Sequence, residues 1–180
     1  WSRTSNIDPT IWYWVNVEGE AMEYEFAYNR STGVVQTIPT EYGFTEDNIG
    51  HIAPHQAVWV KVQDSGPGSI SVNNQARVRS SLPLKSGSQP ESSSYEIIRL
   101  NTRRDKRFFD GTVLYFDKNF SSGKDFADSE KKMNDSKKLP EIYTQVENKN
   151  MALNGMPELT EQSYVFPISV RNRVEGEIII

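Results

Sequence analysis

The sequence lacks several features that would restrict its chemistry. It contains no cysteine among its 180 residues, so disulfide bonds and thiolate zinc sites are excluded. Long hydrophobic runs are also missing: the longest extend over a few residues, whereas a membrane-crossing helix needs about 20. The sequence therefore predicts no membrane insertion.

An excess of basic charge is missing as well. The chain has 20 Lys and Arg against 24 Asp and Glu, which gives a formal net charge of −4 and a pI near 5.3. Because nucleic-acid-binding domains present a basic surface, this balance argues against a nucleic-acid partner. Charged residues at 24% and apolar residues at 36% are typical of a folded globular protein.

Helical periodicity is scarce, and the one candidate is a short helix from Asp125 to Met133. Short runs of alternating side chains, separated by turn signals, dominate instead. This pattern predicts an all-β fold of antiparallel β-sandwich or jelly-roll modules with long loops and at most one short helix. The main predicted strands are 11–15, 21–28, 34–38, 57–62, 69–72, 95–100, 111–116, 141–144, 151–153, 164–170 and 176–180.

Two of these strands carry specific expectations about burial. In strand 57–62, Val58, Val60 and Val62 share one face, which we expect to lie in a core. In strand 11–15 both faces are apolar, which indicates a central strand.

The sequence also predicts two features of strand pairing. Asn154-Gly155 is a favoured two-residue hairpin turn. The apolar segment 177–180 should pair with another strand, because an uncovered edge of this kind promotes aggregation.

Residues 80–94 are rich in Ser, Gly and Pro, a composition typical of a linker or of a long surface loop. We predict a linker at 83–94 between a β-rich module at 1–82 and a second β-sandwich module at 95–180. The chain begins at Trp1, with no initiator Met or signal peptide, and ends inside a predicted strand. We therefore expect both modules to be truncated parts of a longer parent chain.

No set of residues in the sequence forms a convincing catalytic group. His51 and His55 are four residues apart, but Pro54 lies between them and no third metal ligand is evident. No Gly-x-Ser-x-Gly motif occurs. The glutamates between 18 and 25 alternate, as on the solvent-facing side of a strand. We predict a protein that is not an enzyme and needs no organic cofactor.

A calcium ion is the one cofactor that the sequence leaves open. Carboxylate oxygens are preferred calcium ligands, and the second half of the chain contains Asp110, Asp117, Asp125 and Asp128. We take Asp125 and Asp128 as candidate calcium ligands. The alternative is that these acids are solvated in a lysine-rich loop, because the ordered Asp-x-Asp-x-Asp-Gly pattern is absent.

Aromatic side chains form the most suggestive group. Trp12, Trp14, Trp59 and Tyr24 lie in predicted strands, and exposed rings on a β-sandwich can stack on sugar rings. We take these four as candidate glycan-stacking residues. The alternative is that they form an aromatic core.

The order of several short motifs resembles a known kind of region. The motifs are 6–14, the turn-rich loop 42–48, 52–62, 69–78, 97–100, 110–116, 122–125, Asp128 with Lys131, 139–143, 151–157 and 165–168. In this order they resemble the β-rich region that precedes the C-terminal sorting domain of bacterial surface proteins exported by the type IX secretion system. The resemblance implies a secreted protein at the cell surface of a Gram-negative bacterium. It implies a structural or adhesive role, with no shared catalytic residues.

Three hypotheses follow for function. The preferred one is a non-catalytic structural or adhesive β module of a secreted cell-surface protein. Its partners would be a surface polysaccharide or another surface protein, together with adjacent domains of the parent chain. The alternative is a carbohydrate-binding module that uses exposed Trp and Tyr and is attached to a secreted hydrolase. The third is a fragment of an enzyme whose active site lies elsewhere in the parent.

Overall fold

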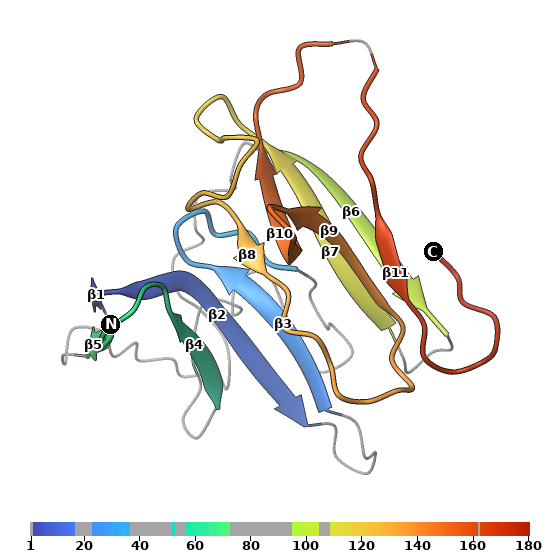
Figure 1. Ribbon diagram of the computed structural model, residues 1–180, viewed down its shortest axis with the longest axis horizontal. Coiled ribbons are helices and arrows are strands. Elements are labelled where there is room, and N and C mark those ends of the chain that lie inside the picture. The colour runs from blue at the N-terminus through green and yellow to red at the C-terminus, as the bar shows by residue number, and fades with distance from the viewer. Residues whose placement is uncertain are drawn as a thin grey trace, which may run out of the picture.

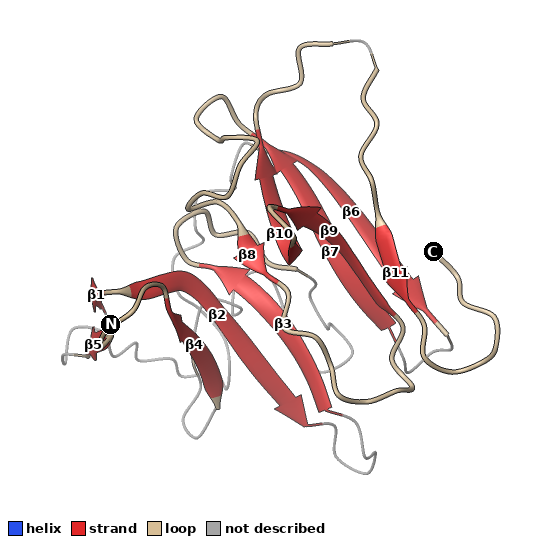
Figure 2. Cartoon of the chain, viewed as in Figure 1, coloured by secondary structure: helices blue, strands red, loops and turns tan. Residues whose placement is uncertain are grey.

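A computed structural model describes residues 2–16, 23–36, 52, 57–72, 95–104, 109–161 and 163–180. Within these ranges the chain forms strands and contains no helix (Figure 2), so the all-β prediction is confirmed. The predicted linker 83–94 lies outside the described residues, and so do His51 and His55. In the same ranges, no helix is long and apolar enough to span a bilayer.

The first segment of the chain, residues 2–72 where they are described, forms a small antiparallel sheet in the order β3-β2-β4. The strand β2, apolar on both faces, is the central one, as its sequence predicts. A separate antiparallel pair joins β1 to β5 (Figure 1). The strands are β1 (Ser2–Ser5), β2 (Ile7–Asn16), β3 (Glu23–Asn29), β4 (Val58–Val62) and β5 (Ser69–Ser71).

The second segment of the chain, residues 95–180 where they are described, forms a six-stranded sheet in the order β11-β9-β10-β7-β6, with β8 paired to β10. The hairpin β9–β10 folds back so that β10 lies between β9 and β7, and β10 therefore runs parallel to β7. This parallel pair departs from the purely antiparallel arrangement we predicted. The strands are β6 (Glu96–Arg103), β7 (Phe109–Phe116), β8 (Ser129–Glu130), β9 (Glu141–Val146), β10 (Lys149–Met156) and β11 (Ser169–Arg171).

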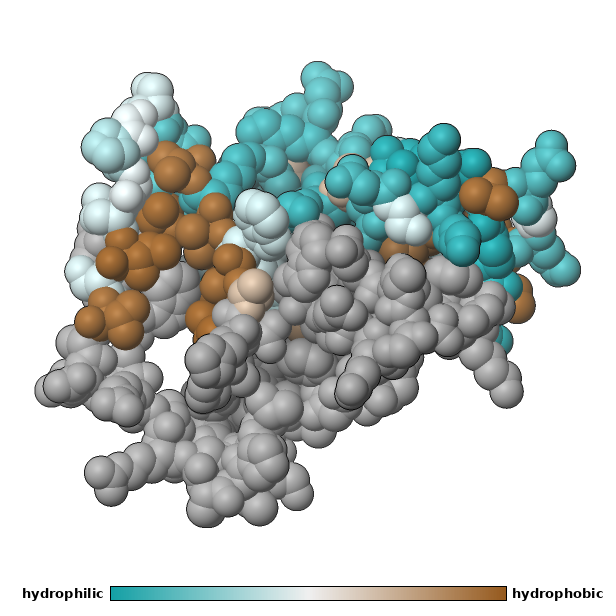
Figure 3. Space-filling view, turned by 90° about the horizontal axis from the view of Figure 1, so that it is seen from below, coloured by the Kyte–Doolittle hydropathy of each residue, from teal (hydrophilic) through white to brown (hydrophobic). Residues whose placement is uncertain are grey.

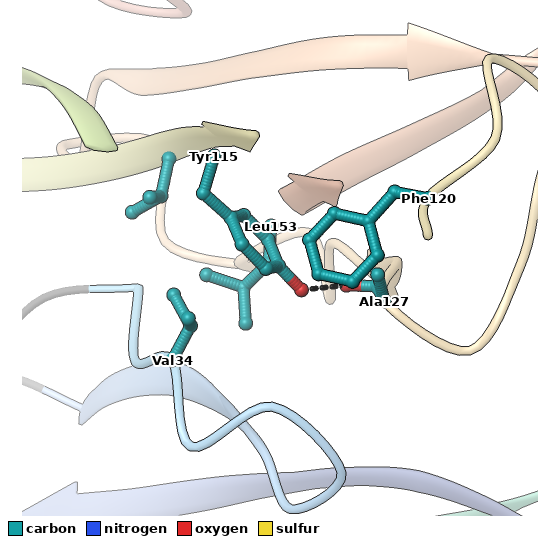
Figure 4. Packing of buried hydrophobic residues seen from close by; sticks show 6 residues of the cluster. Val34, Tyr115, Phe120, Ala127 and Leu153 are labelled. Atoms are coloured by element: carbon teal, nitrogen blue, oxygen red, sulfur yellow. Dashed lines mark hydrogen bonds between the residues drawn. The ribbon is translucent and has the colours of Figure 1, made fainter. Parts of the chain in front are cut away.

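Side chains from the two sheets pack together in common buried clusters. Trp12 and Ala27 from the first sheet pack against Ala152 of β10. Val34, which follows β3, packs in a second cluster with residues of β7, β10 and the loop after β7 (Figure 4). In that cluster the Tyr115 hydroxyl donates a hydrogen bond to the carbonyl oxygen of Ala127. Described residues on both sides of the predicted linker therefore belong to common core clusters.

The predicted helix at 125–133 is wrong. Residues 125–128 form a turn, and Ser129–Glu130 is the strand β8. Carboxylates hold this turn: Asp125 Oδ1 accepts the Ala127 N–H at 2.7 Å, and Asp128 Oδ2 accepts the Asp125 N–H at 2.9 Å. Such local side-chain bonds to the backbone compete with helix formation.

The predicted hairpin turn at Asn154-Gly155 is also wrong, because both residues lie inside β10. The turn between β9 and β10 is Glu147-Asn148, with φ angles of 49° and 62°. Gly155 has a packing role instead. A Cβ atom there would lie 2.4 Å from the Cβ of Ala127, so glycine is needed for this close approach.

The valine face of β4 is less buried than we predicted. Val58 is half-buried and packs against the cluster of Tyr13 and Phe26, whereas Val60 is 36% exposed and Val62 is 41% exposed. The strand lies at the edge of the described part of its sheet, where alternation alone does not ensure burial. In Figure 3, hydrophobic residues gather on the side of the molecule where Figure 1 places β1, β4 and β5.

The C-terminal segment pairs as predicted. The backbone of Ile179 exchanges two hydrogen bonds with that of Arg103 at the end of β6, at 2.8 and 2.9 Å. The chain end is therefore held against the edge of the larger sheet.

Candidate functional site

Trp12 is a core residue. It is 5% exposed, and its indole Nε1–H donates to the Glu130 carbonyl oxygen at 2.9 Å. Trp14 and Tyr24 lie on β2 and β3, but their side chains fall outside the described part of the structure. Trp59 is 50% exposed. Of the four predicted glycan-stacking residues, the structure thus shows Trp59 with a ring open to solvent.

Asp125 and Asp128 have bonds within the chain. Asp128 is 2% exposed and accepts hydrogen bonds from the backbone N–H groups of Asp125 and Gly155. Asp125 accepts from the N–H groups of Ser121 and Ala127. The two carboxylates stabilise the loop before β8 and its contact with β10. Their use as calcium ligands stays a prediction, and no cluster of three or more His, Asp or Glu suited to a metal occurs in the described ranges.

The exposed face of Trp59 belongs to a larger charged area around β8, which we call the Trp59–lysine surface. Trp59 and Lys61 project from the same face of β4, since they are two residues apart in a strand. Glu130 and Lys132 are likewise two residues apart, at and just after β8. The surface consists of Trp59, Lys61, Lys124, Glu130, Lys132 and Lys149.

Glu130 is the electrostatic centre of this surface. Its carboxylate forms ion pairs with the ammonium groups of Lys61, Lys124 at 2.5 Å and Lys149 at 3.2 Å. Burial alone would raise the pKa of Glu130, but hydrogen bonds from the three lysines lower it to about 2. Burial likewise lowers the pKa of Lys124, but the bond to Glu130 outweighs it and the net shift is upward. Glu130 and Lys124 are therefore both charged at neutral pH.

Lys132 lies between the Trp59 ring and the strand β8 that carries Glu130. Its Nζ lies 4.8 Å from the centroid of the Trp59 ring, within the range of a cation–π interaction. The indole of Trp59 thus lies beside an ammonium group.

The strand β8 is placed by contacts with both sheets. It pairs with β10, and the Thr10 hydroxyl of β2 donates to the Ser129 hydroxyl at 2.9 Å. The Trp12 indole donates a hydrogen bond to the carbonyl oxygen of Glu130, the residue after Ser129. In Figure 1, β8 accordingly lies between β3 and β10.

The extended backbone at and just after β8 turns the side chains of Lys131 and Lys132 to opposite sides. Lys131 points inward, where its Nζ contacts Asp110 Oδ2 at 2.6 Å, and both side chains are nearly inaccessible to solvent. Gln36 Nε2 and the Ile142 N–H also donate to Asp110, at 2.9 Å each. Glu130 and Lys132 therefore point outward on either side of a buried ion pair.

The sequence interpretation missed this lysine cluster. Its members come from β4, the loop before β8, β8 itself, the segment just after β8 and β10, and no sequence pattern links them. The available signal is the alternation at Glu130-Lys131-Lys132, which fits a strand with one inward and two outward side chains.

No family model, curated protein or solved structure matches this chain.

Proposed function

We propose that this chain is a non-catalytic structural or adhesive β module of a secreted bacterial cell-surface protein. The observation that carries the proposal is the joint core of the two sheets, with polar links across it. Besides the bonds of Thr10 and Trp12 to β8, Asn29 Nδ2 donates to the Phe126 carbonyl oxygen at 3.0 Å, and Gln36 Nε2 donates to the Gly111 carbonyl oxygen at 2.8 Å.

Such bonds favour a rigid scaffold. Buried polar groups that are satisfied by specific partners make one arrangement of two sheets more favourable than sliding alternatives. A rigid β scaffold can space neighbouring domains and display side chains at fixed positions. The secreted, cell-surface setting follows from the sequence resemblance, and it is proposed on that basis.

Adhesion is tested with the purified chain coupled to beads, which are passed over immobilised bacterial envelope material at controlled shear. We expect the folded protein to retain beads in a saturable manner and free protein to compete. A matched sample coupled after irreversible denaturation should not retain beads. Equal retention by both samples, or by neither, would contradict an adhesive role.

The secretion setting has a separate test in the natural gene. A C-terminal sorting domain encoded downstream of residue 180 would support it. A parent protein without any such domain would contradict it.

A second candidate, a carbohydrate-binding module, is favoured by the exposed ring of Trp59. A glycan array compares the natural protein with Trp59→Ala and with Val165→Ala, which removes another exposed apolar side chain elsewhere in the chain. We expect binding that the first substitution abolishes and the second preserves. Binding unaffected by Trp59→Ala would argue against this candidate.

A further inference from the structure

We propose that the side chains of Asp110 and Lys131 condense to an isopeptide bond, a covalent amide inside the core. The buried ion pair described above is the state before this reaction. The bond would join β7 to the segment just after β8. This inference goes beyond the proposed function and does not depend on it, because it concerns the chemistry of one buried pair and not a ligand.

The two reacting groups are already in contact. Lys131 Nζ lies 2.7 Å from Asp110 Oδ1 and 2.6 Å from Asp110 Oδ2. A nitrogen so close to both oxygens is also within about 3 Å of the carbon that joins them, the separation of reacting atoms in a near-attack arrangement. Because the fold holds the two groups together, the reaction needs no encounter between them.

Burial makes the condensation favourable. The side chains of Lys131 and Asp110 are 3% and 9% exposed. In water, solvation of the separate ions opposes amide formation, but ions in a protein core have lost that solvation. An amide is neutral, and its burial is costly only where it lacks hydrogen-bond partners. The reaction therefore replaces two buried charges with a neutral group.

The polar groups around Asp110 suit both the intermediate and the product. Gln36 Nε2 donates to Oδ1, and the Ile142 N–H donates to Oδ2, at 2.9 Å each. Whichever oxygen stays on the carbon, one of these donors faces the negative charge that develops on it. The Gly111 carbonyl oxygen lies 3.3 Å from Lys131 Nζ, in position to accept the N–H of the new amide.

The reaction balances without any further reactant. The Lys131 ammonium gives one proton to a carboxylate oxygen of Asp110, and the nitrogen lone pair then forms the bond to Cγ. The nitrogen loses a second proton, the bond from Cγ to the hydroxyl oxygen breaks, and the hydroxyl leaves with this proton as water. Glu141, a buried carboxylate that pairs with Arg171, lines the same small cavity as Asp110 and Lys131 and can relay the second proton.

Mass spectrometry of the purified natural chain tests the bond. We expect the intact mass of the denatured protein to lie one water molecule below the mass calculated from its sequence. Trypsin does not cleave after an acylated lysine, so digestion should release one linked species that joins residues 108–118 to residues 125–132. Fragmentation of this species should place the link at Asp110 and Lys131.

The variant Lys131→Arg keeps the positive charge but replaces the reacting amine. It should have its full calculated mass and give no linked species. The matched control is Lys124→Arg, at a lysine that also contacts a carboxylate but is 25% exposed. This control should lose one water molecule, as the natural chain does. Circular dichroism checks that both variants are folded.

Two results would overturn the inference. A natural chain of full calculated mass would show that the pair stays ionic. A loss of water without the linked species, or one that persists in Lys131→Arg, would instead indicate a cyclic imide at Asp110-Gly111. The digest of the natural chain decides between these outcomes even where Lys131→Arg does not fold.

Discussion

At the scale of single residues, the buried ion pair of Asp110 and Lys131 is the most consequential feature. The carboxylate accepts hydrogen bonds from Lys131, Gln36 and the backbone of Ile142, so residues from distant parts of the chain meet on it. Such a pair contributes little net stability compared with apolar replacements, but removing one partner leaves an uncompensated buried charge.

Lys131→Met should therefore lower the free energy of unfolding by about 3–5 kcal/mol. Urea unfolding measured by circular dichroism checks this value. Lys137→Met, at an exposed position, is the control and should change it by less than about 0.5 kcal/mol. Similar stabilities for the two variants would show that the buried pair is not important.

The raised pKa of Asp128 predicts that the free energy of unfolding depends on pH. Burial raises its pKa to about 7, while the backbone N–H groups of Asp125 and Gly155 act in the opposite direction. In the unfolded chain the pKa is about 3.9. Between these values the folded protein binds a proton that the unfolded chain lacks, so Asp128 makes the free energy of unfolding fall as pH rises from about 4 to about 7.

Asp128→Asn should remove this contribution. Urea unfolding at pH 4.5 and 7.5 should show a smaller loss of stability toward high pH in the variant, by a few kcal/mol at most, since one pKa unit corresponds to about 1.4 kcal/mol. Asp135→Asn, on an exposed loop, is the control and should behave like the natural chain. An unchanged pH dependence in Asp128→Asn would refute this assignment.

At the scale of elements, β10 is the strand on which the larger sheet depends. It pairs with β9, β7 and β8, and its residues from Met151 to Gly155 are buried. A strand covered on both faces tolerates little change in volume. The close contact of Gly155 with Ala127 is the tightest example in this strand.

Gly155→Ala should lower the free energy of unfolding by about 1–3 kcal/mol, because the added methyl group forces the backbone at Ala127 to move. Chemical denaturation gives the value. In the control Gly123→Ala, the new Cβ would meet the flexible end of the Glu147 side chain at 3.1 Å, so a smaller effect is expected. A larger loss in the control would contradict the packing role of Gly155.

At the scale of the whole molecule, the shared clusters predict one cooperative unfolding transition. All four tryptophans lie within residues 1–59, so their fluorescence reports on the first segment. Gly155→Ala lies in the second segment, and it should lower the fluorescence midpoint in urea as much as the midpoint measured by far-UV circular dichroism. A fluorescence midpoint that stays unchanged would show that the two segments unfold independently.

The sequence alone determined the fold class and most strand positions. Side-chain alternation and turn signals are local properties, and they correctly indicated β2 as a central strand and the spans that became β5, β6, β7 and β9. The pairing of segment 177–180 was predicted from an equally local feature. An apolar run of this kind would form an exposed strand edge if it were unpaired.

Only the tertiary structure decided which faces are buried and which residues meet. Alternation shows that two side chains share a face, but not whether another sheet covers it, and so Trp12 is buried while Val62 is exposed. The role of Gly155 depends on Ala127, and the charge of the Trp59–lysine surface depends on separate elements meeting at Glu130. These contacts join residues far apart in the chain, and short-range patterns carry no information about them.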